Sequence, residues 1–401
     1  ISSLAINWQR FLPDAIFLCP NAPEICNDNP QGFQWFDMTL DKDAVLEKSL
    51  IALKVTGAVV RSPQEWLAHP QGQILADRPV VQITKIGDAP IESPKAGARP
   101  LSNLRVLDLT RVLAGPTSAR TLAEHGAQVL HVSSPNLPTM MMAEMDTGHG
   151  KRQAHLDLTK REDETRLLEL VKDVDVFNQG FRKGTLDKRG FGPEAMAELR
   201  PGIIYVSENC YGHHGPWAER PGWEQLAQTV SGVAQLQGEL APLAPDHERA
   251  IAAGDNPSVP RLAPAPMNDY STAYFAAYGV LDALRRRATE GGSWHVQVSL
   301  TQTAMWYLRL GMNSNAEVEQ IAPMGAETNI FSKGLSKDAL YKLIEEGSGL
   351  ASESGIEHFF ESHDTDYGKM RHLAPVLQMS ATKPYWSSGA RPLGSDLPIW
   401  E

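Results

Sequence analysis

The chain has 401 residues, 42% of them hydrophobic and 21% charged, which is the composition of a globular protein with room for two domains. With 37 basic and 48 acidic residues its net charge is −11, which argues against nucleic acid as a partner. Three cysteines are too few for a disulfide framework and indicate a reducing compartment without structural zinc, and no apolar run approaches the roughly 20 residues of a membrane span. We therefore expect a cytoplasmic protein with no membrane partner.

The first 100 residues carry short, mixed patterns. They predict a strand at Ala15–Leu18, helices over 45–54 and 62–70, and a strand over 78–86. The stretch 87–100 is rich in Pro, Gly and Ala and is interpreted as a linker.

After this linker, strand and helix patterns alternate. Strands are predicted over 104–109, 127–133, 174–177 and 202–207, with helices over 115–126 and 160–172. A helix then begins at Asp269, followed by a strand over 294–300 and helices over 301–312 and 337–347. This alternation predicts an α/β fold with a mostly parallel sheet, whose ligands lie at the carboxyl ends of the strands.

The first strand-to-helix turn reads LTRVLAGPT and lacks the G-x-G-x-x-G fingerprint, which argues against a dinucleotide-dependent oxidoreductase. Ala114 and Gly115 would let a ligand approach the end of the strand, but tight packing of the helix on the strand fits the pattern equally well. The adjacent His213 and His214 do not share a helix face and lack further ligands, so no metal site is predicted there. No G-x-S-x-G elbow supplies a hydrolase serine.

A basic cluster follows the strand over 174–177. Arg182, Lys183, Lys188 and Arg189 fall within eight positions and could hold phosphates by charge-assisted hydrogen bonds. A solvated charged face explains the same run equally well.

Asp269 stands where a proline-bounded loop becomes an amphipathic helix. As an N-cap it would stabilise that helix by ~1 kcal/mol. The positive end of the helix would also lower the pKa of its carboxyl group, and carboxylates act as covalent nucleophiles. Both interpretations stay open from the residues alone.

Six segments in order, from Leu101 to about Leu310, resemble the family III CoA-transferases, the CaiB/BaiF group. They are LSNLRVLDLTRVLAGPTSARTLAEHGAQVLHV, GKRQAHLDL, DVDVFNQGFRKGTLDKRGFG, LRPGIIYVS, YGHHGPWAERPGWEQLAQTVSG and MNDYSTAYFAAYGVLDAL. Residues 373–400 resemble the tail of a subgroup and residues 62–90 the family's small-domain segment. That order is similar to a variant that joins two transferase-like halves, with the first half truncated.

The resemblance implies a Rossmann-like large domain over 96–310 and a smaller α/β domain. Residues 45–95 are then a small-domain-like segment, and residues 311–401 return to the large domain. Residues 1–44 are atypical and resemble a fragment of the phospholipase/carboxylesterase group, without its nucleophile. The resemblance also implies a homodimer.

The implied activity is ping-pong transfer of coenzyme A between an acyl-CoA and a carboxylic acid, with no metal. By resemblance, Asp269 is the nucleophile, forming first a mixed anhydride and then an enzyme-CoA thioester, and Glu224 is an acid near the active centre. The residues matched to CoA binding are Val112, Leu113 and Ala114 at the first turn, Leu156 at the adenine, and Arg182, Lys188 and Arg189 at the nucleotide end.

Some positions depart from the family pattern. Ser133 and Ser134 stand where the family often has Glu-Arg or Glu-Pro, and Gly180 replaces a common Asn. The glycine-rich loop of the small domain has no clear counterpart. Three alternatives therefore stay open: an acyl-CoA racemase or epimerase of the same superfamily, a non-catalytic CoA-binding protein, and an esterase with an unidentified serine.

Overall fold

The computed structural model of the chain describes residues 40–240, 260–263, 265–311 and 359–400, together with the short strands β1 (Glu24–Ile25) and β2 (Phe33–Gln34). Two compact units are present, Ile1–Val59 and Val60–Glu401. In the first unit, β1 pairs antiparallel with β2, and α2 (Leu40–Ala52) covers most of the helix predicted over 45–54. The strand predicted at Ala15–Leu18 and the helix predicted over 337–347 lie outside the described residues.

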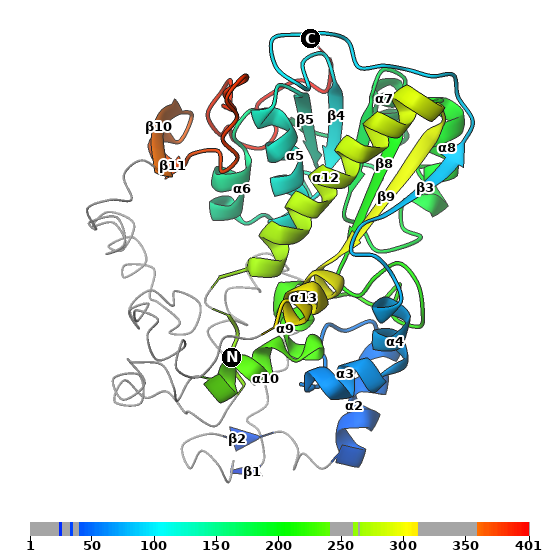
Figure 1. Cartoon of the computed structure of the whole chain (residues 1–401), viewed down its shortest axis with the longest axis vertical. Helices are drawn as coiled ribbons and strands as arrows, with labels where there is room; N and C mark the ends of the chain where they lie inside the picture. Colours follow the sequence, from blue (N-terminus) through cyan, green and yellow to red (C-terminus); the bar gives the residue numbers. More distant parts are fainter. Residues whose placement is uncertain are drawn as a thin grey trace. The chain divides into compact units, whose positions relative to one another are not determined.

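The second unit is built on a seven-stranded sheet in the order β3-β9-β8-β7-β4-β5-β6 (Figure 1). The strands are β3 (Gln82–Gly87), β4 (Arg105–Leu109), β5 (Gln128–Ser133), β6 (Lys151–His155), β7 (Val176–Gln179), β8 (Ile204–Asn209) and β9 (Ser293–Ser299). All neighbours are parallel except β3 and β9, so the predicted mostly parallel sheet is confirmed. From β4 onward the order is that of a Rossmann fold, and it reverses between β4 and β7, where such sheets bind ligands.

The domain boundary between residues 95 and 96 stays a prediction, and the segment before it supplies one strand and two short helices to the second unit. The strand predicted over 78–86 forms as β3, but it pairs with β9 at the edge of the large sheet. The helix predicted over 62–70 is two short helices, α3 (Pro63–Ala68) and α4 (Pro70–Ala76), which meet at His69. The Nε1–H of the buried Trp66 points at the sulfur of Met305, 3.2 Å away, so this segment packs within the second unit.

Helices cover both faces of the sheet. α5 (Ala114–Glu124) and the long α12 (Met267–Glu290) pack on one face, where Val106, Ala276 and Val280 share one hydrophobic cluster. The other face carries α7 (Arg161–Val171) and α8 (Pro193–Leu199), around Leu107 and its neighbours. Because adjacent strand residues point to opposite faces, Val106 and Leu107 serve the two clusters in turn.

The remaining elements lie at the ends of the sheet and after it. They are α6 (Met141–Thr147), the short 3-10 helix η1 (Asp187–Arg189), α9 (Glu224–Ser231), α10 (Val233–Leu240), α13 (Leu300–Arg309), β10 (Phe360–Thr365) and β11 (Gly368–Leu373). The last residues lie against the sheet unit: Trp386 Nε1 donates to the Arg120 carbonyl at 3.1 Å, and Trp400 Nε1 to the Leu170 carbonyl at 2.9 Å.

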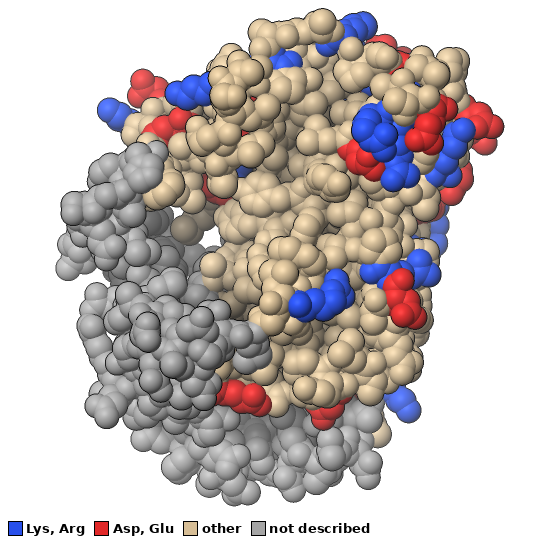
Figure 2. All heavy atoms as spheres, viewed as in Figure 1, with Lys and Arg blue, Asp and Glu red and all other residues tan. Residues whose placement is uncertain are grey.

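None of the helices in the described ranges is both long and apolar enough to cross a bilayer. On the face drawn in Figure 2, basic and acidic side chains are interspersed and do not gather into one continuous basic patch.

Candidate active site

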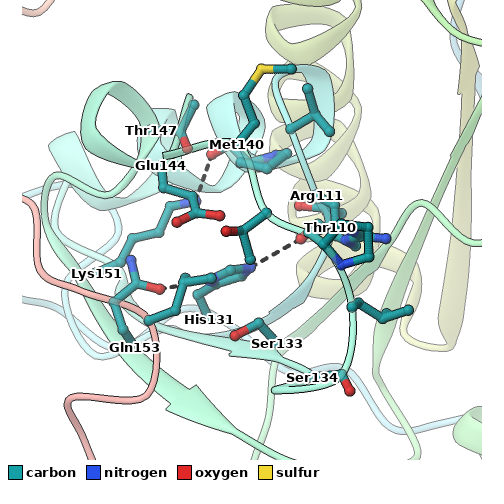
Figure 3. A pocket seen from close by; sticks show the side chains of 16 residues that line it. Thr110, Arg111, His131, Ser133, Ser134, Met140, Glu144, Thr147, Lys151 and Gln153 are labelled. Atoms are coloured by element: carbon teal, nitrogen blue, oxygen red, sulfur yellow. Dashed lines mark hydrogen bonds between the residues drawn. The ribbon is translucent and has the colours of Figure 1, made fainter. Parts of the chain in front are cut away.

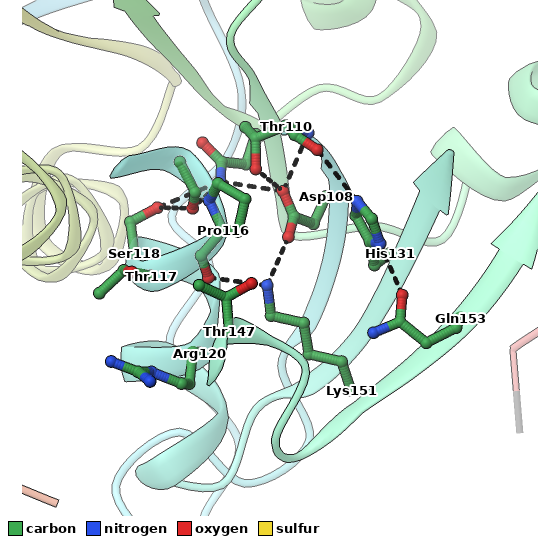
Figure 4. Close-up of polar contacts among 12 residues, drawn as sticks. Asp108, Thr110, Pro116, Thr117, Ser118, Arg120, His131, Thr147, Lys151 and Gln153 are labelled. Atoms are coloured by element: carbon green, nitrogen blue, oxygen red, sulfur yellow. Dashed lines mark hydrogen bonds and ion pairs between the residues drawn. The ribbon is translucent and has the colours of Figure 1, made fainter. Parts of the chain in front are cut away.

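The first strand-to-helix turn, after β4, is held by a buried polar network (Figure 4). Lys151 Nζ, from β6, donates to Asp108 Oδ2 at 2.8 Å and to the Pro116 carbonyl at 2.7 Å. Asp108 also accepts from the backbone N–H of Thr110 at 3.1 Å. Burial opposes ionisation of Asp108, but the cation of Lys151, with His131 nearby, holds the pKa of its carboxyl below the ordinary value. A buried ion pair thus fixes this turn beside the point where the strand order reverses.

The three residues matched to CoA at this turn differ in accessibility. Val112 is 45% exposed and has φ +69°, a left-handed conformation that strains a β-branched residue. Leu113 is the N-cap of α5, and Ala114 is buried. A Cβ added to Gly115 would lie 2.3 Å from the Cβ of Thr110, so Gly115 serves close packing of the helix. Of these positions, only Val112 presents a side chain well exposed to a ligand.

A pocket opens at the carboxyl ends of β4 and β5, against the first half of β6 (Figure 3). Its lining comes from the β4–α5 turn, β5 and the loop after it, α6, β6 and the C-terminal segment: Thr110, Arg111, Val112, Pro116, His131, Ser133, Ser134, Leu137, Pro138, Thr139, Met140, Glu144, Thr147, Lys151, Gln153 and Leu393. Ser133 and Ser134, which depart from the family pattern, therefore face this pocket. Leu156 is 4% exposed and belongs to the core, so its match to an adenine-lining position stays a prediction that the pocket does not support.

Hydrogen bonds within the pocket orient its polar side chains. His131 contacts Gln153 Oε1 through Nδ1 at 2.6 Å and the Thr110 carbonyl through Nε2 at 3.0 Å. Arg111 donates to the Pro138 carbonyl, and partial burial lowers the pKa of its guanidinium, against the charge of Glu144. Burial also raises the pKa of Glu144. Arg111 is therefore a cation at the pocket that was not predicted from the sequence.

The basic cluster after β7 does not line this pocket. Arg189 is paired with Glu164 of α7 at 3.0 Å, and Lys183 Nζ donates to the His213 carbonyl at 2.9 Å. Arg182 and Lys188 are exposed. The interpretation as a solvated charged face thus describes the basic cluster better, because Arg189 is already paired with Glu164 of α7.

Asp269 is not the N-cap of its helix, so that prediction is wrong. The cap position of α12 is Pro266, and Asp269 is the third helical residue, in the first turn. Glu224, the first residue of α9, caps this helix instead. Its Oε1 accepts from the backbone N–H of Asn268 at 3.2 Å. Gln228 holds the same oxygen at 2.6 Å. The start of α12 is therefore capped by a side chain from another helix.

Three carboxyl groups influence one another at this place. Burial raises the pKa of Asp269 to about 8, and the charges of Glu224 and Glu208 add to the effect. The prediction of a lowered pKa is thus wrong, because desolvation and two like charges outweigh the helix end. Burial, with the charge of Asp108, likewise raises the pKa of Glu208 to about 8. Glu208 was not predicted from the sequence, although its place at the carboxyl end of β8 was a usable signal.

The carboxyl cluster and the pocket share a neighbour. Tyr270, next to Asp269, donates its hydroxyl to Asp146 of α6 at 3.2 Å, and Asp146 pairs with Arg120 at 2.8 Å. The same helix α6 supplies Glu144 and Thr147 to the pocket. The carboxyl cluster and the pocket both lie toward the carboxyl ends of the parallel strands.

This arrangement defines an α/β protein with a Rossmann-ordered sheet, a pocket at its ligand-binding edge and, beside it, a cluster of one buried and two half-buried carboxyl groups. A sequence profile described as CoA-transferase family III matches residues 101–333. The chain belongs to the family III CoA-transferases.

Two curated relatives set the scale of the similarity. An "Acyl-CoA transferase" of Gibberella moniliformis is 32% identical over 86% of this chain and 61% of its own length. An "Acetyl-coenzyme A transferase nodX" of Hypoxylon pulicicidum is 35% identical over 63% of this chain and 42% of its own. The chain thus spans less than two thirds of either relative.

A solved structure described as a CAIB/BAIF family protein from Brucella suis shares the fold. Its TM-score is 0.55 at 22% identity, and the match covers 74% of this chain and 97% of that one.

Proposed function

We propose that the protein transfers coenzyme A between an acyl-CoA and a carboxylic acid, with Asp269 as the covalent nucleophile. The observation that carries this proposal is a half-buried aspartate in the first turn of α12, with two further carboxyl groups whose charges raise its pKa, within the segment that the family profile matches. A carboxyl group with a pKa near neutrality can be ionised when needed at little cost.

The reaction proceeds through exchanges at two carbonyl carbons. A carboxylate oxygen of Asp269 attacks the thioester carbonyl, and the C–S bond breaks. CoA departs as the thiolate, and the acyl group is now joined to Asp269 in a mixed anhydride. The thiolate then attacks the Asp269 carbonyl, releasing the first carboxylic acid and forming an enzyme-CoA thioester. The second acid attacks this thioester and gives a new mixed anhydride. CoA thiolate finally attacks its acyl carbonyl, which yields the new acyl-CoA and restores the Asp269 carboxylate.

Glu224 and Glu208 have positioning roles in this scheme. Glu224 fixes the first turn of α12 through the backbone N–H of Asn268, and thereby the place of Asp269. The charges of Glu224 and Glu208 raise the free energy of the Asp269 carboxylate, as its raised pKa records. The Asp269 carboxylate loses its negative charge when it forms the anhydride, so the repulsion from the two glutamates ends at that step. Backbone N–H groups near the site would stabilise the oxyanions.

CoA would lie along the first turn, with its nucleotide end toward the pocket beside it. Val112 is the exposed side chain at that turn, and Arg111 and His131 line the pocket beyond. A guanidinium suits CoA phosphates because it forms charge-assisted, bidentate hydrogen bonds. Arg182 and Lys188, which are exposed, are further candidates from the family match. Relatives include a succinyl-CoA--L-malate CoA-transferase of Chloroflexus aurantiacus and an acetyl-CoA:oxalate CoA-transferase of Acetobacter aceti, so only the substrate class is proposed.

We further propose a cytoplasmic homodimer, as the family resemblance implies. Light scattering on the full chain during size-exclusion chromatography tests the dimer: a mass of twice 44.0 kDa is expected, and a monomer of unchanged activity would contradict it.

Trapping tests the nucleophile. Incubation with an acyl-CoA and hydroxylamine should convert the Asp269 side chain to a hydroxamate that peptide mass spectrometry locates. Asp269→Ala should abolish transfer, while Asp282→Ala, on the same helix but paired with Arg285 and Arg286, should retain it. Unchanged transfer by Asp269→Ala would refute the assignment.

The raised pKa of Asp269 also suits a general base near neutral pH, which favours one alternative, an acyl-CoA epimerase. Deuterium exchange at the acyl α-carbon in D2O, without transfer to any acid, would support that activity. CoA binding by calorimetry without either reaction would instead support a non-catalytic CoA-binding protein.

A further inference from the structure

Three histidines from distant parts of the chain meet beside α6. His149 lies in the turn between α6 and β6, and His363 and His372 lie on β10 and β11 of the antiparallel hairpin, which Figure 1 shows next to α6. The ring centroids of His149 and His372 are 4.0 Å apart, and those of His363 and His372 are 4.9 Å apart. One nitrogen from each ring lies within 4.8 Å of the others.

Two of these nitrogens already have the spacing of metal ligands. His372 Nε2 and His363 Nδ1 are 3.2 Å apart. Two nitrogens at 2.0–2.1 Å from a tetrahedral zinc ion are separated by about 3.3 Å. His372 Nδ1 lies 2.9 Å from the Leu373 carbonyl, which fixes the proton on Nδ1 and leaves Nε2 with a lone pair. Such a hydrogen bond on the second nitrogen is usual for a metal-binding histidine.

The third histidine, His149, lacks a hydrogen-bond partner among the described residues. His149 is fully buried, and neither of its ring nitrogens has a hydrogen-bond partner in the described part of the chain. A buried polar group without a partner costs free energy, so its presence calls for an explanation. Coordination of one of its nitrogens supplies such a partner.

We propose that His149, His363 and His372 bind one divalent transition-metal ion, Zn²⁺ by ligand type, with water in the fourth position. The ion would fasten the β10–β11 hairpin to the α6–β6 turn, so its first effect is on stability. Since α6 also lines the pocket, the ion would hold one wall of the proposed CoA site in place. The absence of metal expected from the sequence would then be incorrect, because that expectation rested on the few cysteines, the adjacent His213 and His214, and the family resemblance.

Calorimetric titration of tag-free, chelator-treated full chain with ZnCl2 tests the proposal. One ion per chain should bind, and Co²⁺ should give the visible absorption of a histidine-ligated ion. His363→Ala and His372→Ala should each weaken binding at least about 100-fold, the upper end of the effect of an outer hydrogen-bond partner. His214→Ala, which removes a histidine elsewhere, should bind as the wild type does.

Thermal unfolding gives an independent reading, because an ion that binds only the folded state raises the melting temperature. Zinc should raise it for the wild type and His214→Ala but not for the hairpin variants. His149→Ala opens a cavity in a buried site, so the test rests on the two hairpin variants, whose folding circular dichroism verifies. Absence of saturable zinc binding, or binding that both hairpin variants retain, would overturn the proposal and leave a plain hydrogen bond between His363 and His372.

Discussion

Glu224 caps the helix that carries Asp269: its Oε1 accepts the backbone N–H of Asn268 at 3.2 Å. The cap comes from a different helix, α9, whose Gln228 holds the same oxygen at 2.6 Å and accepts from the backbone N–H of Ala263 at 2.7 Å. One buried carboxyl group thus joins the start of α9, the segment before α12 and the first turn of α12. The position of the proposed nucleophile depends on this link.

Removing the cap should cost stability and activity together. Glu224→Ala leaves the Asn268 N–H without its acceptor, so the free energy of unfolding should fall by about 1–3 kcal/mol. Transfer should also fall because Asp269 loses its fixed position. Glu224→Gln keeps an oxygen acceptor and should retain most of the stability. Urea unfolding of both variants measures this, and an alanine variant as stable as the wild type would refute the cap.

The pKa of about 8 for Asp269 predicts the pH dependence of transfer. If its carboxylate is the nucleophile, kcat/KM should rise about tenfold per pH unit below pH 8 and level off above it. Glu208→Gln removes one of the charges that raise this pKa, so the rise should shift to lower pH. Steady-state kinetics with one acyl-CoA checks both, and a profile flat from pH 6 to pH 9 would contradict the role of Asp269.

The same shift has a consequence for stability. The folded pKa of Asp269 lies above its unfolded value near 3.8, so the folded state binds more protons between these values and stability falls as pH rises through about 8. Asp269→Asn cannot ionise and should unfold at a higher temperature than the wild type at pH 8.5. This comparison is the control that separates lost chemistry from lost folding.

The buried pair of Lys151 and Asp108 should be sensitive to loss of one partner. Lys151→Met leaves the Asp108 carboxyl without its 2.8 Å partner and should reduce stability by about 3–5 kcal/mol. The double variant Lys151→Met with Asp108→Leu should recover much of that loss, because neither charge is then buried alone. Chemical denaturation in a double-mutant cycle provides the measurement. Additive losses would show that the two groups are not coupled.

The strained Val112 should reveal a trade between stability and binding. Val112→Gly relieves a left-handed β-branched residue and should raise stability by about 1 kcal/mol. The more flexible turn and the lost side chain should weaken CoA binding. Val112→Ala keeps a Cβ at this φ and is the matched control. Calorimetry with CoA measures the binding, and tighter binding by the glycine variant would contradict the contact.

The sheet could be predicted because each strand carries its own local signal. The alternation over 104–207 predicts β4, β5, β7 and β8 well, and with them the edge where ligands bind. The position of Asp269 at the start of a helix was likewise visible. Local pattern also predicted β3, but it gave no sign of the antiparallel pairing with β9, which lies far along the chain.

The electrostatics of the site could not be predicted because they depend on long-range contacts. The raised pKa of Asp269 comes from burial and from Glu208 and Glu224, which the sequence separates widely from it. Likewise, the sequence predicts that Arg189 binds the nucleotide end of CoA, but the fold pairs Arg189 with Glu164. The pocket is lined by Arg111, His131 and Gln153 from three separate segments, so no short sequence motif predicts it.

The most direct test of the central claim is to look for CoA covalently bound to Asp269. The full chain is incubated with an acyl-CoA and no acceptor acid, reduced with borohydride or digested under acidic conditions, and mapped by mass spectrometry. We predict a CoA thioester, or its reduced alcohol, on Asp269 in the peptide that contains the start of α12, and its absence in Asp269→Asn. Transfer activity without any covalent intermediate, or an adduct on another residue, would contradict the account.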